Sequence, residues 1–182
     1  MTILFIILFL LIFISSLCYF VFYVFKELKQ LLLGYGIPFV PTPDYKISNL
    51  IENIELKDGQ IFIDLGCGDG KILQAICENF PKAIVIGYEN SGDPYKLALK
   101  RKDKYNLNYQ VYKKDFFTES LENATIIYSY LLPYIMARVW KKIKNDCHKG
   151  TLFYSNYFQI PEEQIYKIIH LKNNQNIYIY KV

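Results

Sequence analysis

The stretch Ile61-Phe62-Ile63-Asp64-Leu65-Gly66-Cys67-Gly68-Asp69-Gly70 joins an apolar run to a glycine-rich loop and decides the fold. Its first half, residues 61–65, is typical of a strand buried on both faces of a parallel sheet. The glycines allow sharp turns and let the backbone approach a ligand where a Cβ atom would collide. Residues 71–80 then have the pattern of a helix, so the loop lies where open α/β sheets bind ligands.

Helices and strands continue to alternate from this loop to the end of the chain. We expect helices at 44–55, 93–105 and 133–144, strands at 83–88, 109–112, 125–131 and 151–157, and a final hairpin of strands at 165–171 and 177–182. This order predicts an α/β fold with a Rossmann-like, doubly wound and mostly parallel sheet of seven strands that ends in a C-terminal antiparallel hairpin.

Two carboxylates make the loop acidic, because Asp64 precedes its first glycine and Asp69 its last. A dinucleotide-binding loop has the spacing G-x-G-x-x-G and cradles a pyrophosphate at the start of the following helix. Here the third glycine comes one residue early, and the acidic groups would repel a pyrophosphate. The loop instead suits a cofactor that carries an ammonium and a sulfonium group.

Two more acidic residues follow the next predicted strands. Glu89 ends the second strand, about 20–25 residues beyond the loop, where an acidic residue can bind ribose hydroxyls. After the third strand, Asp115 offers a carboxylate for an adenine amino group and Phe116 a ring for the adenine face. The structural alternative for Asp115 is a cap at a turn. Together, the order of these residues predicts a nucleoside-bearing cofactor.

The chain has 182 residues and a formal net charge of +4, which fits one domain with an appendage. This modest charge gives no reason to expect nucleic acid as a partner. The basic clusters at 100–104 and 141–144 are typical of solvated helix ends, and contact with anionic lipid headgroups is the alternative. Neither the four cysteines nor the two histidines have metal-ligand spacing, so no metal site is predicted.

The first 25 residues carry no charge and are almost entirely apolar. A run of about 20 such residues spans the hydrocarbon core of a membrane as a helix. A signal peptide would need a basic start and a small-residue cleavage site, which are missing. Because Lys26 and Lys29 follow the run, the positive-inside rule places the remaining chain in the cytoplasm. We predict a single-pass membrane anchor with a juxtamembrane turn over residues 1–33, and the bilayer as a partner.

Over about residues 44–182 the chain resembles the class I, seven-strand S-adenosylmethionine-dependent methyltransferases. Residues 64–70 are similar to that family's first motif, Glu89 to its ribose-binding acid, and Asp115-Phe116 to its adenine-side pair. The resemblance implies S-adenosylmethionine as the cofactor. The cofactor-binding residues that we expect are Asp64, Gly66, Cys67, Gly68, Asp69, Gly70, Glu89, Asn90, Asp115 and Phe116.

Residues 36–43, 69–71 and 87–90 are similar to a smaller group within this family. Its members are the membrane-anchored protein-lysine methyltransferases that modify ATP synthase subunit c and the adenine nucleotide translocase, with their prokaryotic relatives. The resemblance implies a lysine of a membrane protein as the methyl acceptor, and it makes Pro41-Thr42-Pro43 a lid over the cofactor. The glycines and prolines of residues 34–43 indicate a linker by themselves. The methyltransferase domain is then expected at residues 44–182.

The end of the fourth predicted strand, residues 128–133, faces the methyl group in such folds. It lacks the Asn/Asp-Pro-Pro-Tyr motif of amide- and adenine-methylating relatives, and the chain has no Pro-Cys nucleophile for cytosine. Methyl transfer depends mainly on positioning, although an amine acceptor must first lose its proton. Tyr128, Tyr130 and Asp115 are the candidate catalytic residues for this step, and desolvation of the amine by aromatic walls is the alternative. Other functions left open are methylation of RNA or a small molecule, and a non-catalytic S-adenosylmethionine-binding module.

Overall fold

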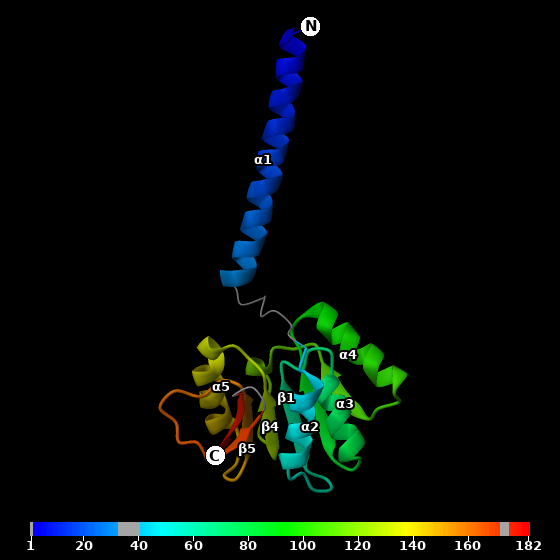
Figure 1. Cartoon of the computed structure of the whole chain (residues 1–182), viewed down its shortest axis with the longest axis vertical. Coiled ribbons are helices and arrows are strands. Elements are labelled where there is room, and N and C mark those ends of the chain that lie inside the picture. Colours follow the sequence, from blue (N-terminus) through cyan, green and yellow to red (C-terminus); the bar gives the residue numbers. More distant parts are fainter. Residues whose placement is uncertain (1, 33–40, 172–174) are drawn as a thin grey trace. The chain divides into compact units, whose positions relative to one another are not determined.

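The computed structural model describes residues 2–32, 41–171 and 175–182, and the chain divides into two units, Met1–Ile37 and Pro38–Val182. The first unit contains the long helix α1. The elements shown in Figure 1 are α1 (Thr2–Leu32), α2 (Asp44–Asn53), β1 (Ile61–Leu65), α3 (Lys71–Asn79), β2 (Ile84–Tyr88), α4 (Gly92–Lys104), β3 (Tyr109–Tyr112), the 3-10 helix η1 (Phe116–Thr118), β4 (Ile126–Ser129), α5 (Pro133–Asp146), β5 (Leu152–Asn156), β6 (Lys167–His170) and β7 (Asn176–Lys181).

The strands form one seven-stranded sheet in the order β3-β2-β1-β4-β5-β7-β6. β7 runs antiparallel to both of its neighbours, and the other pairs are parallel. The predicted fold class is therefore confirmed, including the C-terminal hairpin. In the register, Asp64 lies opposite Tyr128, and Ser129 lies opposite Ser155. The carboxyl ends of β1, β4 and β5 consequently meet at one edge of the sheet.

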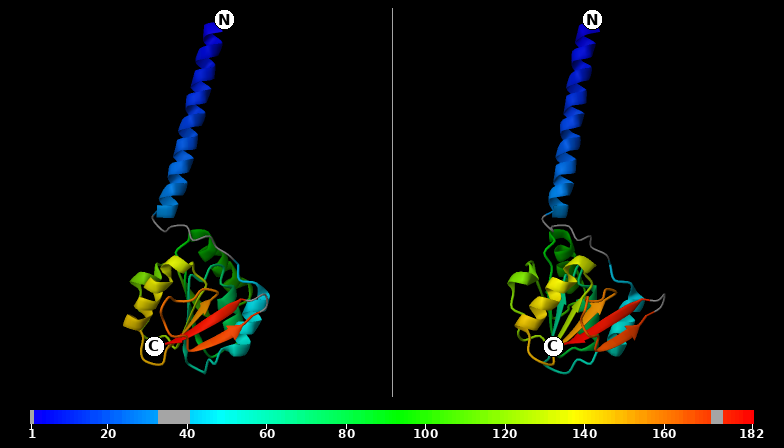
Figure 2. Two further views of the ribbon diagram at one scale, coloured as in Figure 1. Left: turned by 60° about the vertical axis from the view of Figure 1, so that its left-hand side comes forward. Right: turned by 90° about the vertical axis from the view of Figure 1, so that its left-hand side faces the viewer.

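Helices cover both faces of the sheet because the strands alternate apolar side chains between them. α2, α3 and α4 pack side by side on one face, where Phe62 and Leu73 belong to a hydrophobic cluster of buried residues. α5 lies on the opposite face (Figure 2). There the Trp140 ring lies 6.1 Å from the Phe153 ring and 5.6 Å from the Tyr180 ring, measured between centroids. The second unit thus has a core on each side of the sheet.

Helix α1 is apolar along nearly its whole length. The segment Leu4–Lys26 has a mean hydropathy of 2.9, and none of it is buried within the structure. By length and composition, α1 is therefore able to span a membrane, as the sequence predicts.

The structure differs from the predicted element boundaries at the carboxyl edge of the sheet. The strands expected at 125–131 and 151–157 end at Ser129 and Asn156, and η1 was not predicted. β5 ends there because Tyr157 takes a left-handed conformation, with φ of 79°. Of the predicted linker or lid at 34–43, residues 34–40 lie outside the described residues, as do residues 172–174 in the turn of the hairpin.

Candidate active site

The loop between β1 and α3 turns back sharply on three glycines. Gly66, Gly68 and Gly70 have φ values of 79°, 57° and 76°, a region that residues with a Cβ atom rarely adopt. The backbone N–H groups of Gly66 and Cys67 both donate to the carbonyl oxygen of Tyr88, at 2.9 and 3.0 Å. The loop is thereby held against the end of β2, in the position that the sequence predicts for a ligand-binding loop.

Glu89 reaches the middle of this loop from the end of β2. Its Oε2 accepts a hydrogen bond from the Gly68 N–H at 2.9 Å, and its Oε1 accepts one from the Ser91 N–H at 2.7 Å. The glycine loop and Glu89, which are separate in the sequence, are therefore joined by a direct hydrogen bond. Asn90, which follows Glu89, is exposed.

Asp64 lies almost completely out of solvent, with 2% of its surface exposed. Burial raises the pKa of Asp64 well above its usual value, and the nearby carboxylates of Glu89 and Asp69 raise it further. Burial also raises the pKa of the Cys67 thiol, and the charges of Asp64 and Glu89 raise it further. Among the described residues, no Lys, Arg or His side chain lies within 4.0 Å of the Asp64 or Glu89 carboxylate.

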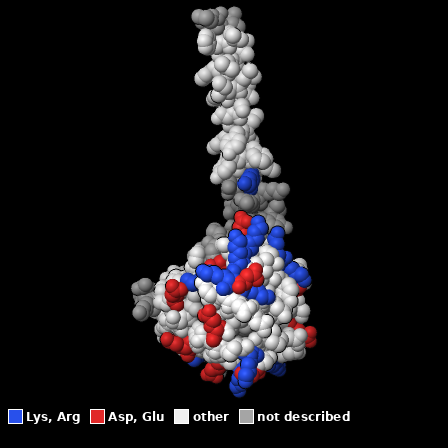
Figure 3. All heavy atoms as spheres, turned by 90° about the vertical axis from the view of Figure 1, so that its right-hand side faces the viewer, with Lys and Arg blue, Asp and Glu red and all other residues white. Residues whose placement is uncertain are grey.

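Asp69 differs from these two acids because an arginine neutralises it. The Nη2 of Arg101 lies 2.6 Å from the Asp69 Oδ2, and its Nε donates to the Asp69 carbonyl at 2.8 Å. A third bond joins Arg101 Nη1 to the Gln74 Oε1 at 2.9 Å. Lys and Arg side chains gather over α4 (Figure 3). Sequence alone therefore does not distinguish Arg101 from its solvated neighbours. The unneutralised charge of the site therefore lies at Asp64 and Glu89.

Asp115 caps η1, the role that the sequence left open beside adenine binding. Its Oδ1 accepts a hydrogen bond from the Phe117 N–H at 2.9 Å, and its side chain is otherwise exposed. Phe116 is buried and contacts the ring of Phe117, with the centroids 4.4 Å apart. The capping bond leaves the second carboxylate oxygen of Asp115 available for a ligand.

The residues around Tyr128 form the far side of the site, at the ends of β4 and β5. The Nδ2 of Asn156 donates to the Tyr128 hydroxyl at 2.7 Å, and both side chains are buried. Burial is the main cause that raises the pKa of Tyr128, and the charge of Asp64 adds to it. Tyr130 is partly exposed, and burial likewise raises its pKa. Both phenols are therefore protonated near neutral pH.

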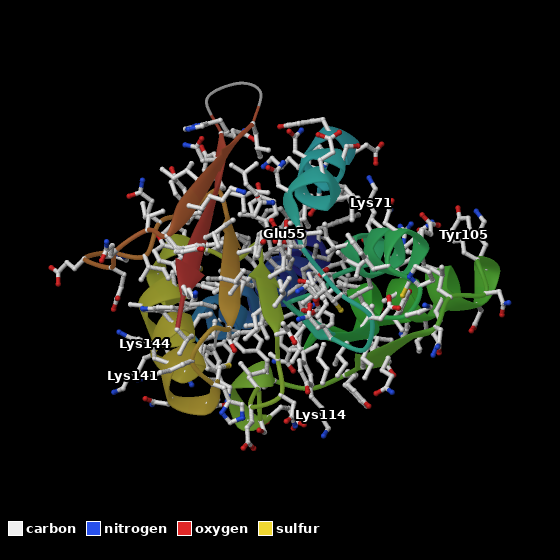
Figure 4. All side chains as sticks on the ribbon, turned by 90° about the horizontal axis from the view of Figure 1, so that it is seen from below. Glu55, Lys71, Tyr105, Lys114, Lys141 and Lys144 are labelled. Carbon is white, nitrogen blue, oxygen red and sulfur yellow. The ribbon has the colours of Figure 1, made fainter. Side chains whose placement is uncertain are left out.

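The segment Pro41-Thr42-Pro43 lies beside the glycine loop. Lys71, the first residue of α3, donates through Nζ to the Thr42 carbonyl at 3.1 Å and pairs with the Asp44 Oδ1 at 2.7 Å. Figure 4 shows Lys71 between α2 and α3. Thr42 is buried and close enough to Tyr128 to lower the pKa of its phenol, against the larger effect of burial. The loop, the segment before α2 and the end of β4 therefore belong to one site.

This arrangement agrees with a family of known proteins. A family model described as the ANTKMT methyltransferase domain matches residues 64–167, more than half of the chain. The chain belongs to this family. The match includes the acidic glycine loop and extends past β5, and it confirms the prediction of an S-adenosylmethionine-dependent methyltransferase.

Individual relatives agree with the family assignment. A protein-lysine N-methyltransferase from Saccharolobus islandicus (strain REY15A) is 27% identical over 152 residues, which cover 80% of this chain and 94% of that protein. A ribosomal RNA small subunit methyltransferase H from Mycoplasmopsis synoviae (strain 53) is 30% identical over 82 residues, only 44% of this chain and 27% of that protein. The similarity to the first protein therefore extends over nearly its whole length.

A solved structure shares the fold. The crystal structure of an RNA methyltransferase from Salinibacter ruber, in complex with S-adenosyl-L-homocysteine, matches with a TM-score of 0.74 at 23% identity. The match covers 79% of this chain and 94% of that one. The family's fold is thus shared across proteins of low sequence identity.

Proposed function

We propose that this chain transfers the methyl group of S-adenosylmethionine to a lysine ε-amine of a membrane protein. The observation that carries the proposal is the buried Asp64 beside Glu89 at the glycine loop, within a chain of the ANTKMT methyltransferase domain family. The similarity to a protein-lysine N-methyltransferase over 94% of that relative's length supports a lysine acceptor.

The charge of the acidic loop fits this cofactor. Asp64 and Glu89 lie close enough for their charges to interact, and among the described residues neither has a cationic partner. A cofactor with an ammonium and a sulfonium group would compensate these charges, whereas a pyrophosphate would be repelled. We assign cofactor contacts to Asp64, Gly66, Cys67, Gly68, Gly70, Glu89, Asn90, Asp115 and Phe116, with Asp69 in the loop that positions them.

The chemistry requires positioning more than acid–base catalysis. When bound, S-adenosylmethionine supplies a methyl group on a positively charged sulfur, which a neutral amine attacks in line. The raised pKa values of Tyr128 and Tyr130 keep both phenols protonated near neutral pH, so they can act as hydrogen-bond partners but not as general bases. We therefore expect desolvation among aromatic side chains to lower the pKa of the acceptor ammonium, so that it releases its proton to water, while Tyr128, Tyr130 and Asp115 orient the amine.

We also propose that α1 anchors the enzyme in a membrane as a single span. Its exposed apolar segment Leu4–Lys26 supports this assignment, and Lys26 at the segment's end favours a cytoplasmic catalytic domain. In this organisation residues 1–33 are the anchor, 34–43 the linker or lid, and 44–182 the catalytic domain. An anchored enzyme is held beside membrane proteins, which fits the proposed acceptor.

The proposed acceptor is tested by following a labelled methyl group. The full chain, in detergent micelles, is incubated with methyl-labelled S-adenosylmethionine and either membranes or total RNA. We expect label in a protein band, as methyl-lysine, and its loss with Asp64→Asn. The exposed Asp58, which pairs with Lys82, provides the control variant Asp58→Asn, which should keep the activity. Label in RNA or in a small molecule would contradict a lysine acceptor.

The proposed topology needs a separate measurement. Protease added to intact cells should leave the catalytic domain untouched, and protease added to inverted membrane vesicles should digest it. The reverse pattern would place the domain outside the cytoplasm. Release of the full chain by alkaline carbonate would contradict a membrane-spanning α1.

A further inference from the structure

Lys46 is a buried lysine at the start of α2. Only 3% of its surface is exposed, and among the described residues no carboxylate lies within 4.0 Å of its ammonium. Burial lowers the pKa of Lys46. Because an unpaired buried ammonium costs free energy, the groups that surround it need a physical explanation.

Two tyrosines hold this ammonium. The Nζ of Lys46 lies 4.6 Å from the centroid of the Tyr130 ring and 5.4 Å from that of the Tyr157 ring, both within cation–π range. The same nitrogen donates to the Tyr130 hydroxyl at 3.5 Å. Aromatic faces and a hydroxyl are the groups that recognise an ammonium without neutralising it.

The backbone of Tyr157 is strained where it presents its ring. Its φ of 79° lies in the left-handed region, which is uncommon for a residue with a bulky side chain. The Tyr157 N–H donates to the Asn176 carbonyl at 2.9 Å, which fixes this conformation to β7. Strain of this kind is retained where the surroundings enforce it, and it is concentrated at functional sites.

A buried acceptor lies next to the tyrosine pair. Tyr130 and Tyr157 directly follow the adjacent strands β4 and β5, and Asn156 precedes Tyr157. Asn156 uses Nδ2 to bind the Tyr128 hydroxyl, but its buried Oδ1 has no hydrogen-bond partner among the described residues. An amide oxygen in this state is suited to accept a hydrogen bond from an incoming amine.

We infer that Tyr130 and Tyr157 form the subsite for the ammonium end of the methyl-accepting lysine, and that Lys46 fills this subsite until the acceptor arrives. The inference rests on the proposed lysine methyltransferase function and deepens it. Lys46 has the same four-carbon stem and ammonium as the acceptor, so it is a close chemical match. On leaving, its ammonium regains hydration, and the acceptor amine meets Tyr130, Tyr157 and the Asn156 Oδ1.

A second lysine–tyrosine pair in the chain provides the matched control. Lys181 Nζ lies 5.4 Å from the centroid of the Tyr166 ring, at the hairpin of β6 and β7, and both residues are exposed. This pair follows neither β4 nor β5. The variants Lys181→Met and Tyr166→Leu therefore remove an exposed lysine–tyrosine contact away from the candidate subsite.

The subsite is tested first by binding, with n-butylammonium as a mimic of a lysine side chain. Ligand-observed NMR on the full chain in micelles compares the wild type with Lys46→Met. If Lys46 fills the subsite nine-tenths of the time, its removal should raise the affinity for n-butylammonium about tenfold. Adding Tyr157→Leu to Lys46→Met should abolish this gain in affinity. The control Lys181→Met should produce no gain for n-butylammonium. Uncharged n-butanol should bind weakly, and equally so, to every variant.

Several outcomes of this test would overturn the inference. They are an unchanged or weaker affinity in Lys46→Met, a gain that survives Tyr157→Leu, and a matching gain for n-butanol. If Lys46→Met fails to fold, as judged by circular dichroism, Lys46→Gln takes its place with the same expectations.

Kinetics with poly-L-lysine separate this inference from the proposed function. Tyr157→Leu should raise KM for poly-L-lysine severalfold and leave the S-adenosylmethionine affinity, measured by calorimetry, unchanged. The control variant Tyr166→Leu should leave KM for poly-L-lysine unchanged. Methyl transfer by Tyr157→Leu with an unchanged KM would overturn the subsite and leave the enzyme function intact. If the wild type transfers no methyl group to any lysine, the proposed function fails, and the n-butylammonium titration still decides whether the ammonium subsite exists.

Discussion

At the scale of single residues, the buried Asp64 lowers the stability of the cofactor-free folded chain. An aspartate in an unfolded chain has a pKa of about 3.9, whereas burial and the neighbouring acids raise the pKa of Asp64 in the folded chain. Between these two pKa values the folded state binds more protons than the unfolded state. The stability of the cofactor-free chain therefore falls as pH rises through this window.

This linkage leads to opposite effects of Asp64→Asn on stability and on binding. At pH 7 the variant should raise the melting temperature of the cofactor-free chain, by roughly 2–4 °C for each kcal/mol gained. Its affinity for S-adenosylmethionine should fall by roughly tenfold to a hundredfold, because hydrogen bonds to charged groups contribute about 1.5–3 kcal/mol. Thermal unfolding and calorimetry measure the two effects. A variant that is both less stable and equally tight would contradict the assigned role.

Arg101 has a measurable role that its neighbours on α4 lack. Arg101→Met leaves the partly buried Asp69 without its cation and should destabilise the chain by roughly 1–3 kcal/mol. Lys96→Met on the same helix removes an exposed pair with Asp93 and should change stability by less than about 0.5 kcal/mol. Urea unfolding of the two variants compares them directly, and equal losses would show that the Asp69 pair is not special.

Sequence predicted some residues of the site and not others, for a physical reason. Asp64 lies near the end of β1 and Glu89 directly follows the adjacent parallel strand β2, so the topology alone brings them together. Arg101 and Lys46 lie within helices, where a basic residue is usually solvated, and only the packing of α4 and α2 turns them inward. The orientation of a long side chain on a helix depends on its tertiary neighbours, which no local pattern contains.

At the scale of elements, the loop before α3 depends on close packing as well as on backbone conformation. Gly59 and Gly70 share a φ of 76°, yet a Cβ on Gly59 meets nothing within 4 Å. A Cβ on Gly70 would lie 2.9 Å from the Tyr109 hydroxyl, which donates to the Ala98 carbonyl at 2.6 Å. The two positions therefore separate conformational strain from steric overlap.

Alanine substitutions at these two glycines should differ in a predictable way. Gly59→Ala should cost about 1–2 kcal/mol, the usual penalty for a left-handed residue. Gly70→Ala should cost about 1–3 kcal/mol more through overpacking, and it should also weaken S-adenosylmethionine binding. Chemical unfolding and calorimetry provide the comparison. Equal losses of stability in Gly59→Ala and Gly70→Ala would mean that α4 and Tyr109 move away from the new Cβ atom at no cost in free energy.

The order and type of the elements were predictable, and their ends at the carboxyl edge were not. Alternation of apolar strands and amphipathic helices predicts the parallel sheet, and the β-branched runs before and after residues 172–176 predict the hairpin. The strand at 151–157 ends early because Tyr157 turns left-handed, which nothing in its own sequence requires. Such turns arise at a site from long-range contacts, here with Asn176.

At the scale of the whole molecule, the two units divide the proposed tasks. All residues assigned to the cofactor and the acceptor lie in the second unit, Pro38–Val182, and the spanning segment lies in the first. A chain reduced to residues 38–182 should therefore keep its affinity for S-adenosylmethionine within about threefold, because it retains every residue assigned to the cofactor. It should also move from the membrane fraction to the supernatant after centrifugation. Retention in the membrane fraction would reveal a second means of attachment in the catalytic unit.

Lys71 is a mechanical link within the second unit. It joins the segment that precedes α2 to the first residue of α3, through the Thr42 carbonyl and the Asp44 carboxylate. In the anchored organisation that we propose, a load passing along the chain from α1 would reach this contact before it reached the first strand of the sheet.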